Sequence, residues 1–479
     1  MSLNLVSTVI ASISYSTPKA VSSVYIGSRL ELFVDEYLIG EMDGAELRLH
    51  KPIPHEVAII HDKPWEGNVC FYHTVFKDGD HFKMYYRGAH YNEQIEEITH
   101  QVVCYAESQD GIHWTKPELG IVEFNGSKKN NIIWDGLGSH NFAPFKDPNP
   151  NCKPDEKYKA IASGEGGLYP FKSPDGIHWS LMSDRPVITR GAFDSQNLAF
   201  WDTTRNRYVD FHRGFTEGVR AIMTCTSTNF INWTEPVWLE YSGIPLEAVH
   251  EVTAERSEHL YTNQITPYYR APHIFMGFPK RFMPSRRVLE HRYNGVSDAV
   301  FMTSRDGLNF KRWGEALIRP GFQKERWGNR NNMIAWGILE TKSDIPGTPN
   351  ELSIYSMEGY YQGESCQMRR FTLRIDGFVS VQAPLNGGEV VTKPLLFAGK
   401  ELVINFSTSA AGSVRVEIQN AKGEAIEGFT LDDSAEIYGD EIEKLVTWKN
   451  GSDLSRLAGK PIRLRFVMKD ADLYSMQFC

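Results

Sequence analysis

The heptapeptide SQDGIHW, residues 108–114, returns almost unchanged as SPDGIHW at residues 173–179. Weaker copies are STNFINW at 227–233, SRDGLNF at 304–310 and RIDGFVSV at 374–381. An Asp-Gly pair supplies the positive φ angles that a tight turn needs, and the Trp or Phe that follows is suited to fill the seam between two packed sheets. Five copies of one turn indicate a repeated structural unit.

A strand rich in aromatic and β-branched residues recurs between these turns. The copies are HFKMYYRG at 81–88, KYKAIAS at 157–163, RYVDFHRG at 207–214, PHIFMGFP at 272–279 and ELSIYSME at 351–358. Each interval between turns is longer than a WD40 blade of about 40 to 45 residues, which leaves room for four strands and longer loops. We therefore predict an all-β fold in which residues 45–385 form a five-bladed β-propeller.

The pattern changes after residue 385. Apolar and polar residues alternate in the stretches ELVINFSTS, GSVRVEIQN, KLVTWKN, PIRLRFVMKD and LYSMQF, with no further Asp-Gly repeat. We expect residues 386–479 to form a β-sandwich of the jelly-roll kind. Residues 1–44 are interpreted as an N-terminal tail and a lead-in strand.

Composition limits the classes of partner. A formal charge of -9 and a pI near 6.0 argue against nucleic acid, because phosphate binding needs clustered Lys and Arg. The six cysteines show no metal-ligand spacing, so no metal site is predicted. The mildly apolar N-terminus is too short to span a bilayer, and we expect no membrane insertion. A trimmed leader would look the same, so a secreted or periplasmic location is expected and a cytoplasmic one is left open. Nothing in the sequence indicates an oligomeric state.

Polar residues precede the first strand of each predicted blade. In a propeller these strands line a central funnel, so their starts converge on one pocket. Hydrogen-bonding side chains there could bind sugar hydroxyls, which both donate and accept; a polar channel that holds water or one cation is the alternative. The candidate substrate-binding residues are Asn68, His140, Asn141, Gln196, Asn197, Asn263, Gln264, Arg330 and Asn331.

Carboxylates at the same positions are the candidate catalytic groups. Glycoside cleavage needs an acid to protonate the leaving oxygen and a carboxylate to activate water or to attack the anomeric carbon. Asp194, Glu66 and Glu258 are the candidates, although the two glutamates could instead hold Arg330 or His259 in salt bridges. Further carboxylates held in reserve are Glu251, Glu255 and Glu358. Aromatic residues in or near loops could stack on sugar rings: Trp65, Tyr91, Tyr169, Tyr268, Tyr269, Tyr360 and Tyr361.

The recurrent turns, together with FDSQNLAFWDTTRNRYVDF at 193–211, resemble the five-bladed propeller glycosidases, which include the invertase and fructanase family and the arabinanase and β-xylosidase family. A sandwich after the propeller is similar to the invertase arrangement. The invertase boxes are replaced here by PWEGN, FDSQN and SEHLYTNQ, so the resemblance implies a catalytic role only for Asp194. It implies no required cofactor and leaves a structural calcium ion open.

The sequence therefore predicts an exo-acting glycoside hydrolase with a carbohydrate substrate. Asp194 would be the nucleophile or base, and Glu258 or Glu66 the acid. A non-catalytic carbohydrate-binding propeller is the main alternative. A glycoside phosphorylase or polysaccharide lyase is a further one, and a phosphorylase would need basic residues of the kind found in KRFMPSRR at 280–287.

Overall fold

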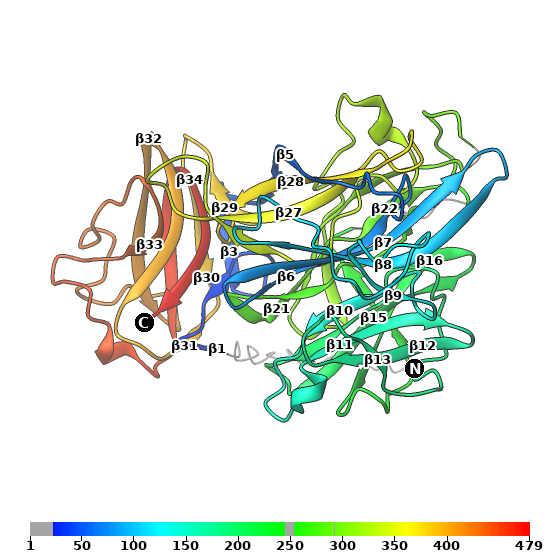
Figure 1. Ribbon diagram of the computed structural model, residues 1–479. Helices are drawn as coiled ribbons and strands as arrows, with labels where there is room; N and C mark the ends of the chain where they lie inside the picture. The colour runs from blue at the N-terminus through cyan, green and yellow to red at the C-terminus, as the bar shows by residue number, and fades with distance from the viewer. Residues whose placement is uncertain (1–22, 245–252, 292) are drawn as a thin grey trace, which may run out of the picture.

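The computed structural model describes residues 23–244, 253–291 and 293–479 (Figure 1). Within these ranges the regular structure is strand, apart from three short 3-10 helices. The prediction of an all-β fold is confirmed. The 3-10 helices are η1 (Pro154–Glu156), η3 (Lys324–Trp327) and η4 (Ser455–Leu457).

Three four-stranded antiparallel sheets follow one another along the first half of the chain. Their order is β6-β7-β8-β9, β10-β11-β12-β13 and β14-β15-β16-β17. The first comprises β6 (Phe71–Asp78), β7 (His81–Asn92), β8 (Glu97–Ser108) and β9 (Ile132–Asp135). The second comprises β10 (Ala143–Lys146), β11 (Tyr158–Gly164), β12 (Gly167–Ser173) and β13 (Ser180–Leu181). The third comprises β14 (Leu198–Asp202), β15 (Arg207–Thr216), β16 (Val219–Ser227) and β17 (Val237–Trp238).

The next stretch divides between two sheets. One has the order β18-β25-β24-β21-β20 and the other β19-β22-β23. The five-stranded sheet holds β18 (Glu240–Ser242), β20 (Thr266–Tyr268), β21 (Ala271–Gly277), β24 (Met302–Ser304) and β25 (Asn309–Arg312). The three-stranded sheet holds β19 (His259–Leu260), β22 (Lys280–Met283) and β23 (Val296–Ala299).

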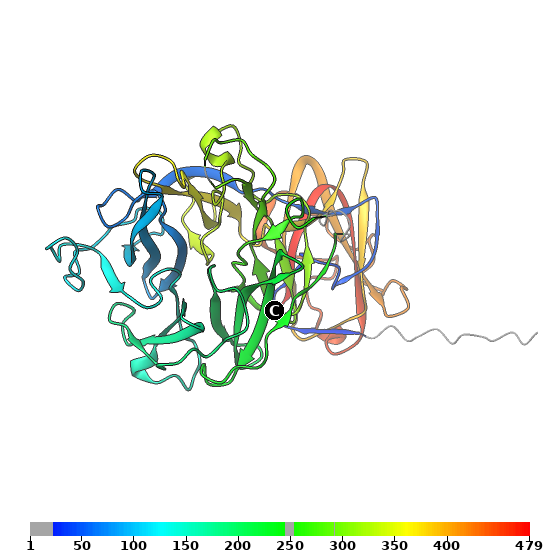
Figure 2. The same cartoon turned by 90° about the vertical axis from the view of Figure 1, so that its right-hand side faces the viewer.

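The last four-stranded sheet is completed by a strand from near the start of the chain. β26 (Leu339–Thr341), β27 (Glu351–Glu358) and β28 (Gln367–Arg374) pair in order, and β5 (Ile53–Ile60) is added antiparallel to β28. This pairing places β5, which precedes the first of these sheets in the chain, in the last of them. In Figure 2 the sheets follow one another in chain order about a common centre.

The repeated turns pack against neighbouring sheets, as predicted. The Ser108 hydroxyl accepts the Gly111 amide at 2.9 Å, and Asp110 Oδ1 accepts the Ile112 and His113 amides at 2.8 Å. The other three copies at 173, 227 and 304 have the same bonds. Gly111 has φ +74°, and a Cβ there would meet the Thr341 side chain of another sheet at 3.0 Å. The Trp114 ring lies 5.9 Å from the Tyr355 ring across the same seam.

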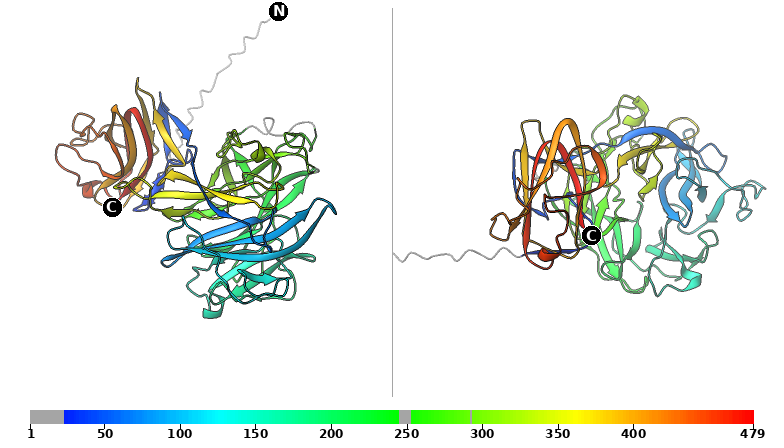
Figure 3. Two further views of the ribbon diagram at one scale, coloured as in Figure 1. Left: turned by 45° about the horizontal axis from the view of Figure 1, so that its top comes forward. Right: turned by 90° about the vertical axis from the view of Figure 1, so that its left-hand side faces the viewer.

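A separate ten-stranded sheet contains the C-terminal strands and lies beside the other sheets (Figures 1 and 3). It holds β29 (Val379–Ala383), β30 (Gly388–Thr392), β31 (Leu395–Phe397), β32 (Leu402–Asn420), β33 (Asp440–Leu445) and β34 (Ile462–Phe478). Its buried residues, among them Phe406, Phe466 and Trp448, form a hydrophobic core of their own.

Two pairs of stretches that the sequence suggests as separate strands are single long strands here. ELVINFSTS and GSVRVEIQN both lie in β32, and PIRLRFVMKD and LYSMQF both lie in β34. The β32–β34 register shifts between Thr408 and Ser413, so the small residues at this point mark an irregularity within one strand rather than a turn.

Strands from the N-terminal region belong to this same sheet. β1 (Val24–Gly27) pairs with β31, β2 (Glu31–Leu32) with β34, β3 (Ile39–Asp43) with β30, and β4 (Glu46–Leu49) with β29. The segment expected to be a tail and lead-in strand is thus built into the sheet from residue 24 onward. β4 and β29 fall within the predicted propeller range of 45–385, yet they pair here. These strands are two to five residues long, too short to show a period.

Candidate functional site

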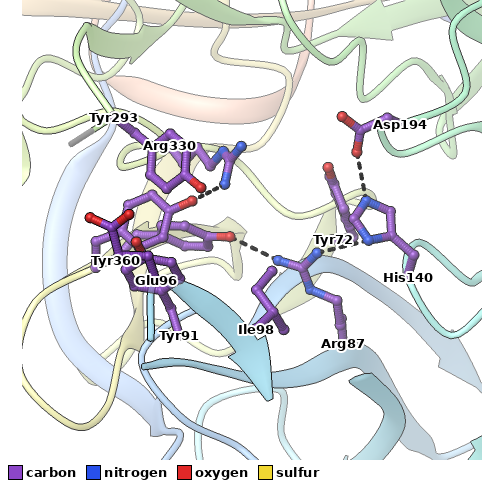
Figure 4. Close-up of a pocket in the computed structure, with 11 residues that line it drawn as sticks. Tyr72, Arg87, Tyr91, Glu96, Ile98, His140, Asp194, Tyr293, Arg330 and Tyr360 are labelled. Carbon is purple, nitrogen blue, oxygen red and sulfur yellow. Dashed lines mark hydrogen bonds and ion pairs between the residues drawn. The ribbon is translucent and has the colours of Figure 1, made fainter. Parts of the chain in front are cut away.

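A pocket of about 190 Å³ opens where several of the sheets meet (Figure 4). Three of its residues come from β6 and β7, two come from the turn and strand that follow, and the others come from loops far away in sequence. Five of the lining side chains are tyrosines, a residue type that stacks well on sugar rings. The lining residues are Tyr72, Arg87, Tyr91, Glu96, Ile98, His140, Asp194, Tyr293, Arg330, Tyr360 and Tyr361.

Asp194 is presented by a tightly held loop. Asn141 Nδ2 donates to the carbonyl oxygens of Phe193 and Ser195 at 2.6 Å each. Asn197 Nδ2 donates to the same two carbonyls at 3.1 and 2.9 Å, and both asparagine side chains are fully buried. The residues on either side of Asp194 are therefore fixed, while its own side chain remains 71% exposed. The amide nitrogens of both predicted binding residues are thus engaged by the backbone on either side of Asp194.

A chain of polar contacts extends from Asp194 across the pocket. His140 Nε2 lies 2.8 Å from Asp194 Oδ1, and Arg87 Nη1 lies 3.2 Å from His140 Nδ1. Burial lowers the pKa of His140 below its usual value. His140 Nδ1 also lies 2.7 Å from Gln101 Oε1, so this nitrogen faces both a donor and an acceptor while Nε2 faces Asp194. Arg87 also donates to the Tyr360 hydroxyl at 2.8 Å (Figure 4).

The carboxyl of Asp194 is held in its ionised form. Burial in the pocket raises its pKa, but the hydrogen bond from His140 and the charges of His140, Arg213 and Arg330 outweigh this effect and lower the pKa to about 2. Asp194 is thus a carboxylate at any pH near neutral.

Strained backbone gathers at this site. Tyr72, Glu96, Arg330 and Tyr361 line the pocket and are non-glycine residues with φ of 57°, 56°, 70° and 63°. Such left-handed conformations persist where the surroundings force them, and they are concentrated at functional sites. The Arg330 side chain donates to the Tyr361 hydroxyl and lies 5.4 to 5.7 Å from the rings of Tyr293, Tyr360 and Tyr361. The candidates from the sequence that the structure brings together in the pocket are Asp194, His140, Arg330, Tyr91, Tyr360 and Tyr361.

Glu66 lies outside this pocket in a buried polar network. Its carboxylate accepts from Lys116 Nζ at 2.6 Å and from the Tyr86 hydroxyl at 2.5 Å, and His61 Nδ1 lies 3.6 Å away. Burial raises its pKa, but His61 and Lys116 overcome this and lower it to about 2. Glu66 is therefore a fully buried carboxylate in an ion pair, and it does not line the pocket.

Glu258 also lies outside the pocket lining, engaged by Arg312 and by Arg281, whose Nη1 is 3.4 Å away. Among the reserve carboxylates, Glu358 is buried and bonded to Arg369 at 2.9 Å. Glu255 is exposed, and Glu251 lies outside the described residues. Neither Glu358 nor Glu255 lines the pocket.

The side chains of the remaining predicted binding residues mostly form hydrogen bonds with the backbone. Asn68 Nδ2 donates to the Tyr91 and Gly363 carbonyls, and Asn263 Nδ2 donates to the Phe211 carbonyl. Gln196 Nε2 donates to the Tyr72 and His73 carbonyls, and its Oε1 accepts from Gln264. Asn331 Oδ1 accepts the Tyr360 amide. All are buried, and their bonds join loops of different sheets.

Sequence reasoning missed several pocket residues: Tyr72, Arg87, Glu96 and Tyr293. A signal for one of them was available. HFKMYYRG and RYVDFHRG both place an Arg-Gly pair at the same point of an aligned strand, which marks Arg87 and, near Asp194, Arg213. Glu96 lies in the exposed turn between β7 and β8, where nothing in the sequence sets it apart.

Among the residues that the structure describes, two groups of side chains have donor atoms close enough for a metal ion. One is the buried set of Asp210, His212 and Cys225, and the other is His55, Glu56 and Asp344 near the surface. In the buried set, both His212 nitrogens are engaged, Nδ1 with Asp210 and Nε2 with the Arg190 carbonyl. Glu56 and Asp344 both bind Arg370. Both sets are thus engaged by partners within the protein.

The hydrogen bonds that Asn141 makes to the loop of Asp194 lead to a testable prediction. Replacing Asn141 by Ala removes three hydrogen bonds to backbone groups. The Ser195 carbonyl keeps its bond from Asn197, and the Phe193 carbonyl keeps those from Asn197 and the Ser195 amide. We expect the free energy of unfolding to fall by about 1–3 kcal/mol and any turnover to fall with it. Urea unfolding and kinetics measure the two effects. An Asn151→Ala variant, in an exposed turn, is the control. Equal free energies of unfolding and equal kinetics for the two variants would contradict the role of Asn141 in holding this loop.

Comparisons with known proteins give structural likenesses alone. No protein-family model and no curated protein matches the sequence. An N-acetylgalactosamine deacetylase from F. plautii, solved with blood group B trisaccharide, is 13% identical with a TM-score of 0.42, covering 68% of this chain and 96% of its own. A Bombyx mori GH32 β-fructofuranosidase is 9% identical with a TM-score of 0.39, covering 90% and 94%. A Coprinopsis cinerea GH62 α-L-arabinofuranosidase is 9% identical with a TM-score of 0.39, covering 68% and 97%.

Glycosidases are thus among the structural matches, as the resemblance of the repeated turns predicts. Because the TM-scores are below 0.5, these likenesses do not establish the activity of this chain. Across the described ranges, no helix has the length and apolar character needed to cross a membrane.

Proposed function

We propose that this protein cleaves a glycosidic bond, with Asp194 as the nucleophile or the base. The observation that carries the proposal is an ionised, solvent-facing carboxylate on a rigid loop at the edge of a tyrosine-lined pocket. A retaining glycosidase uses such a carboxylate to attack the anomeric carbon, and an inverting one uses it to activate water. Both roles need the charged form at neutral pH, and His140 supports that form.

The general acid in this proposal differs from the sequence-based candidates. Glu66 and Glu258 are held by Lys116 and by Arg281 and Arg312, so they are assigned here to structural ion pairs. Glu96 is the second carboxylate that lines the pocket, and we assign it the role of proton donor. A Glu96→Gln variant that keeps full activity on a substrate with a poor leaving group would contradict this assignment.

The architecture and substrate follow as parts of the same proposal. The sheets from β5 to β28 are interpreted as a five-bladed propeller whose fourth blade is split, and the ten-stranded sheet as the sandwich. A pocket that admits one end of a sugar chain favours exo action on an oligosaccharide or polysaccharide. A secreted or periplasmic location, testable by cell fractionation, also belongs to the proposal.

A non-catalytic carbohydrate-binding protein is the second candidate. It is favoured by the exposed position of Glu96 in the turn between β7 and β8, since binding needs no facing acid. Isothermal titration against oligosaccharides, combined with product analysis, separates the two candidates: binding without any product would favour the second.

The contact between His140 and Asp194 predicts a pH effect. The base must be ionised, so activity is lost as pH falls through the pKa of Asp194, which is about 2. In His140→Ala the hydrogen bond is gone, and we expect the acidic limb of kcat/KM to move upward by about 1 to 2 pH units. Exposed His178, paired with Asp175, provides the control as His178→Ala. An acidic limb that stays unchanged in His140→Ala would rule out this role.

A further inference from the structure

Three cations surround one tyrosine ring beside Asp194. The guanidinium carbons of Arg213 and Arg220 lie 4.9 and 5.2 Å from the centroid of the Tyr261 ring. Lys280 Nζ lies 3.7 Å from the same centroid. Tyr261 is tied to the Asp194 loop, because the Ser195 hydroxyl donates to the Tyr261 carbonyl at 2.8 Å. We call Arg213, Arg220, Lys280 and Arg330 the cation cluster.

Several donors of the cation cluster are buried without a hydrogen-bond partner among the described residues. Lys280 is 0% exposed and Arg213 is 4% exposed. The unpaired atoms are Lys280 Nζ, Nε and Nη1 of Arg213, and Nε of Arg220 and Arg330. Buried polar atoms are nearly always paired in native proteins, so a group of unpaired donors calls for a ligand or ion that pairs with them.

The four basic side chains of the cation cluster have one carboxylate in an ion pair with them in the part of the chain that the structure describes. This carboxylate is that of Asp194, 3.9 Å from Arg213 Nη2 and already bonded to His140. Glu258, the next acidic group, is engaged by Arg281 and Arg312. Burial, together with Arg330, Arg220 and Arg213, lowers the pKa of Lys280 well below its usual value, and Asp194 opposes this only in part.

We propose that the cation cluster binds an oxyanion next to Asp194. Guanidinium and ammonium donors are the groups that proteins use for phosphate, sulfate and carboxylate oxygens. The oxyanion is either fixed to the sugar, as a sulfate ester or a uronic acid, or is free inorganic phosphate. The inference deepens the proposed function and rests on it for the sugar, while the anion site itself can be measured without turnover.

Calorimetric titration with inorganic phosphate and with galactose 6-sulfate, using galactose as the neutral control, tests the site. We expect both anions to bind and galactose to bind at least 10-fold more weakly. Lys280→Met and Arg220→Gln should each weaken anion binding about 10- to 100-fold, as loss of a hydrogen bond to a charged group does. Lys422→Met, at an exposed position in the ten-stranded sheet region, should bind as the parent does.

The number of protons taken up on anion binding distinguishes a binding role of Lys280 from a purely structural one. Because Lys280 is surrounded by positive charge, an arriving anion favours its protonated form. Titrations in buffers of different ionisation enthalpy, repeated at several pH values, should therefore show protons taken up on binding in the pH range where Lys280 titrates. In Lys280→Met the uptake should be lost, while in Arg220→Gln it should persist with weaker binding.

The two sources of the oxyanion are separated by products. Faster turnover with phosphate that yields a glycosyl phosphate identifies free phosphate: the bond from the anomeric carbon to the leaving oxygen breaks, a bond to a phosphate oxygen forms, and the leaving oxygen takes a proton. A preference for a charged over a neutral oligosaccharide without phosphate identifies an acidic sugar.

Failure of this inference differs from failure of the proposed function. Anion binding without any cleavage would refute the glycosidase and support the oxyanion site. Cleavage of neutral sugars that is unaffected by Lys280→Met and Arg220→Gln, with no anion binding in the millimolar range, would refute the oxyanion site and leave the glycosidase standing.

Discussion

Replacing Asp194 by Asn is expected to lower kcat/KM by about 10²- to 10⁴-fold on any substrate that the protein cleaves. The amide has nearly the same shape and keeps an oxygen that can accept from His140, but it has no charge with which to attack or to activate water. The loop itself is held by Asn141 and Asn197 through the backbone of Phe193 and Ser195, so the fold should be unaffected.

The matched control is Asp184→Asn, an exposed residue in the segment between β13 and β14 that also contains Asp194. It should keep parental kinetics. Equal activity of Asp194→Asn and Asp184→Asn on a cleaved substrate would remove Asp194 from the mechanism.

The second large effect concerns the packing between two sheets. Lys159 of β11 donates to Asp147 Oδ2 at 2.6 Å, with side chains only 2% and 0% exposed, and the Tyr208 hydroxyl of β15 donates to the same oxygen at 2.6 Å. In Lys159→Met the buried carboxylate of Asp147 loses its positive partner. We expect the free energy of unfolding to fall by about 3–5 kcal/mol, since removing one partner leaves a buried charge uncompensated.

Urea unfolding followed by tryptophan fluorescence measures this change. Lys172→Met is the control, because Lys172 pairs with the exposed Asp155 and surface pairs contribute little. If the two variants unfold at the same urea concentration, the buried pair does not hold the sheets together.

The repeated turn was predictable because each of its bonds depends on residue type. The Ser hydroxyl and Asp carboxylate accept local amides, and Gly takes the positive φ in SQDGIHW. STNFINW keeps the same bonds although Phe230 replaces Gly, at φ 66°. The five aligned strands were also predictable, because a buried strand needs several consecutive apolar or aromatic residues.

The distribution of roles within the site was not predictable. Asn141 and Asn197 differ in nothing visible in sequence from residues that bind sugars, yet their amides are occupied by carbonyls two to four residues or some fifty residues away. Glu66 was a candidate acid, but it forms a buried ion pair with Lys116. Lys116 lies far from Glu66 along the chain. Long-range partners of this kind follow only from the three-dimensional fold.

The prediction of strands from the sequence failed for short strands and for long strands, and for different reasons. β2 and β4 have too few residues to display alternation, so the N-terminal contribution to the ten-stranded sheet had no pattern. β32 contains the run Ser-Thr-Ser-Ala-Ala-Gly-Ser, which is typical of a turn, but it continues as one strand because β34 pairs with it on both sides of the shift in register.

The most direct test of the central claim is product analysis by chromatography and NMR. The purified protein is incubated with neutral, sulfated and uronic oligosaccharides, with and without phosphate, beside Asp194→Asn. Our account predicts that one monosaccharide or glycosyl phosphate is released from a chain end by the parent and not by the variant. Tight binding of an oligosaccharide with no product under any of these conditions would contradict it.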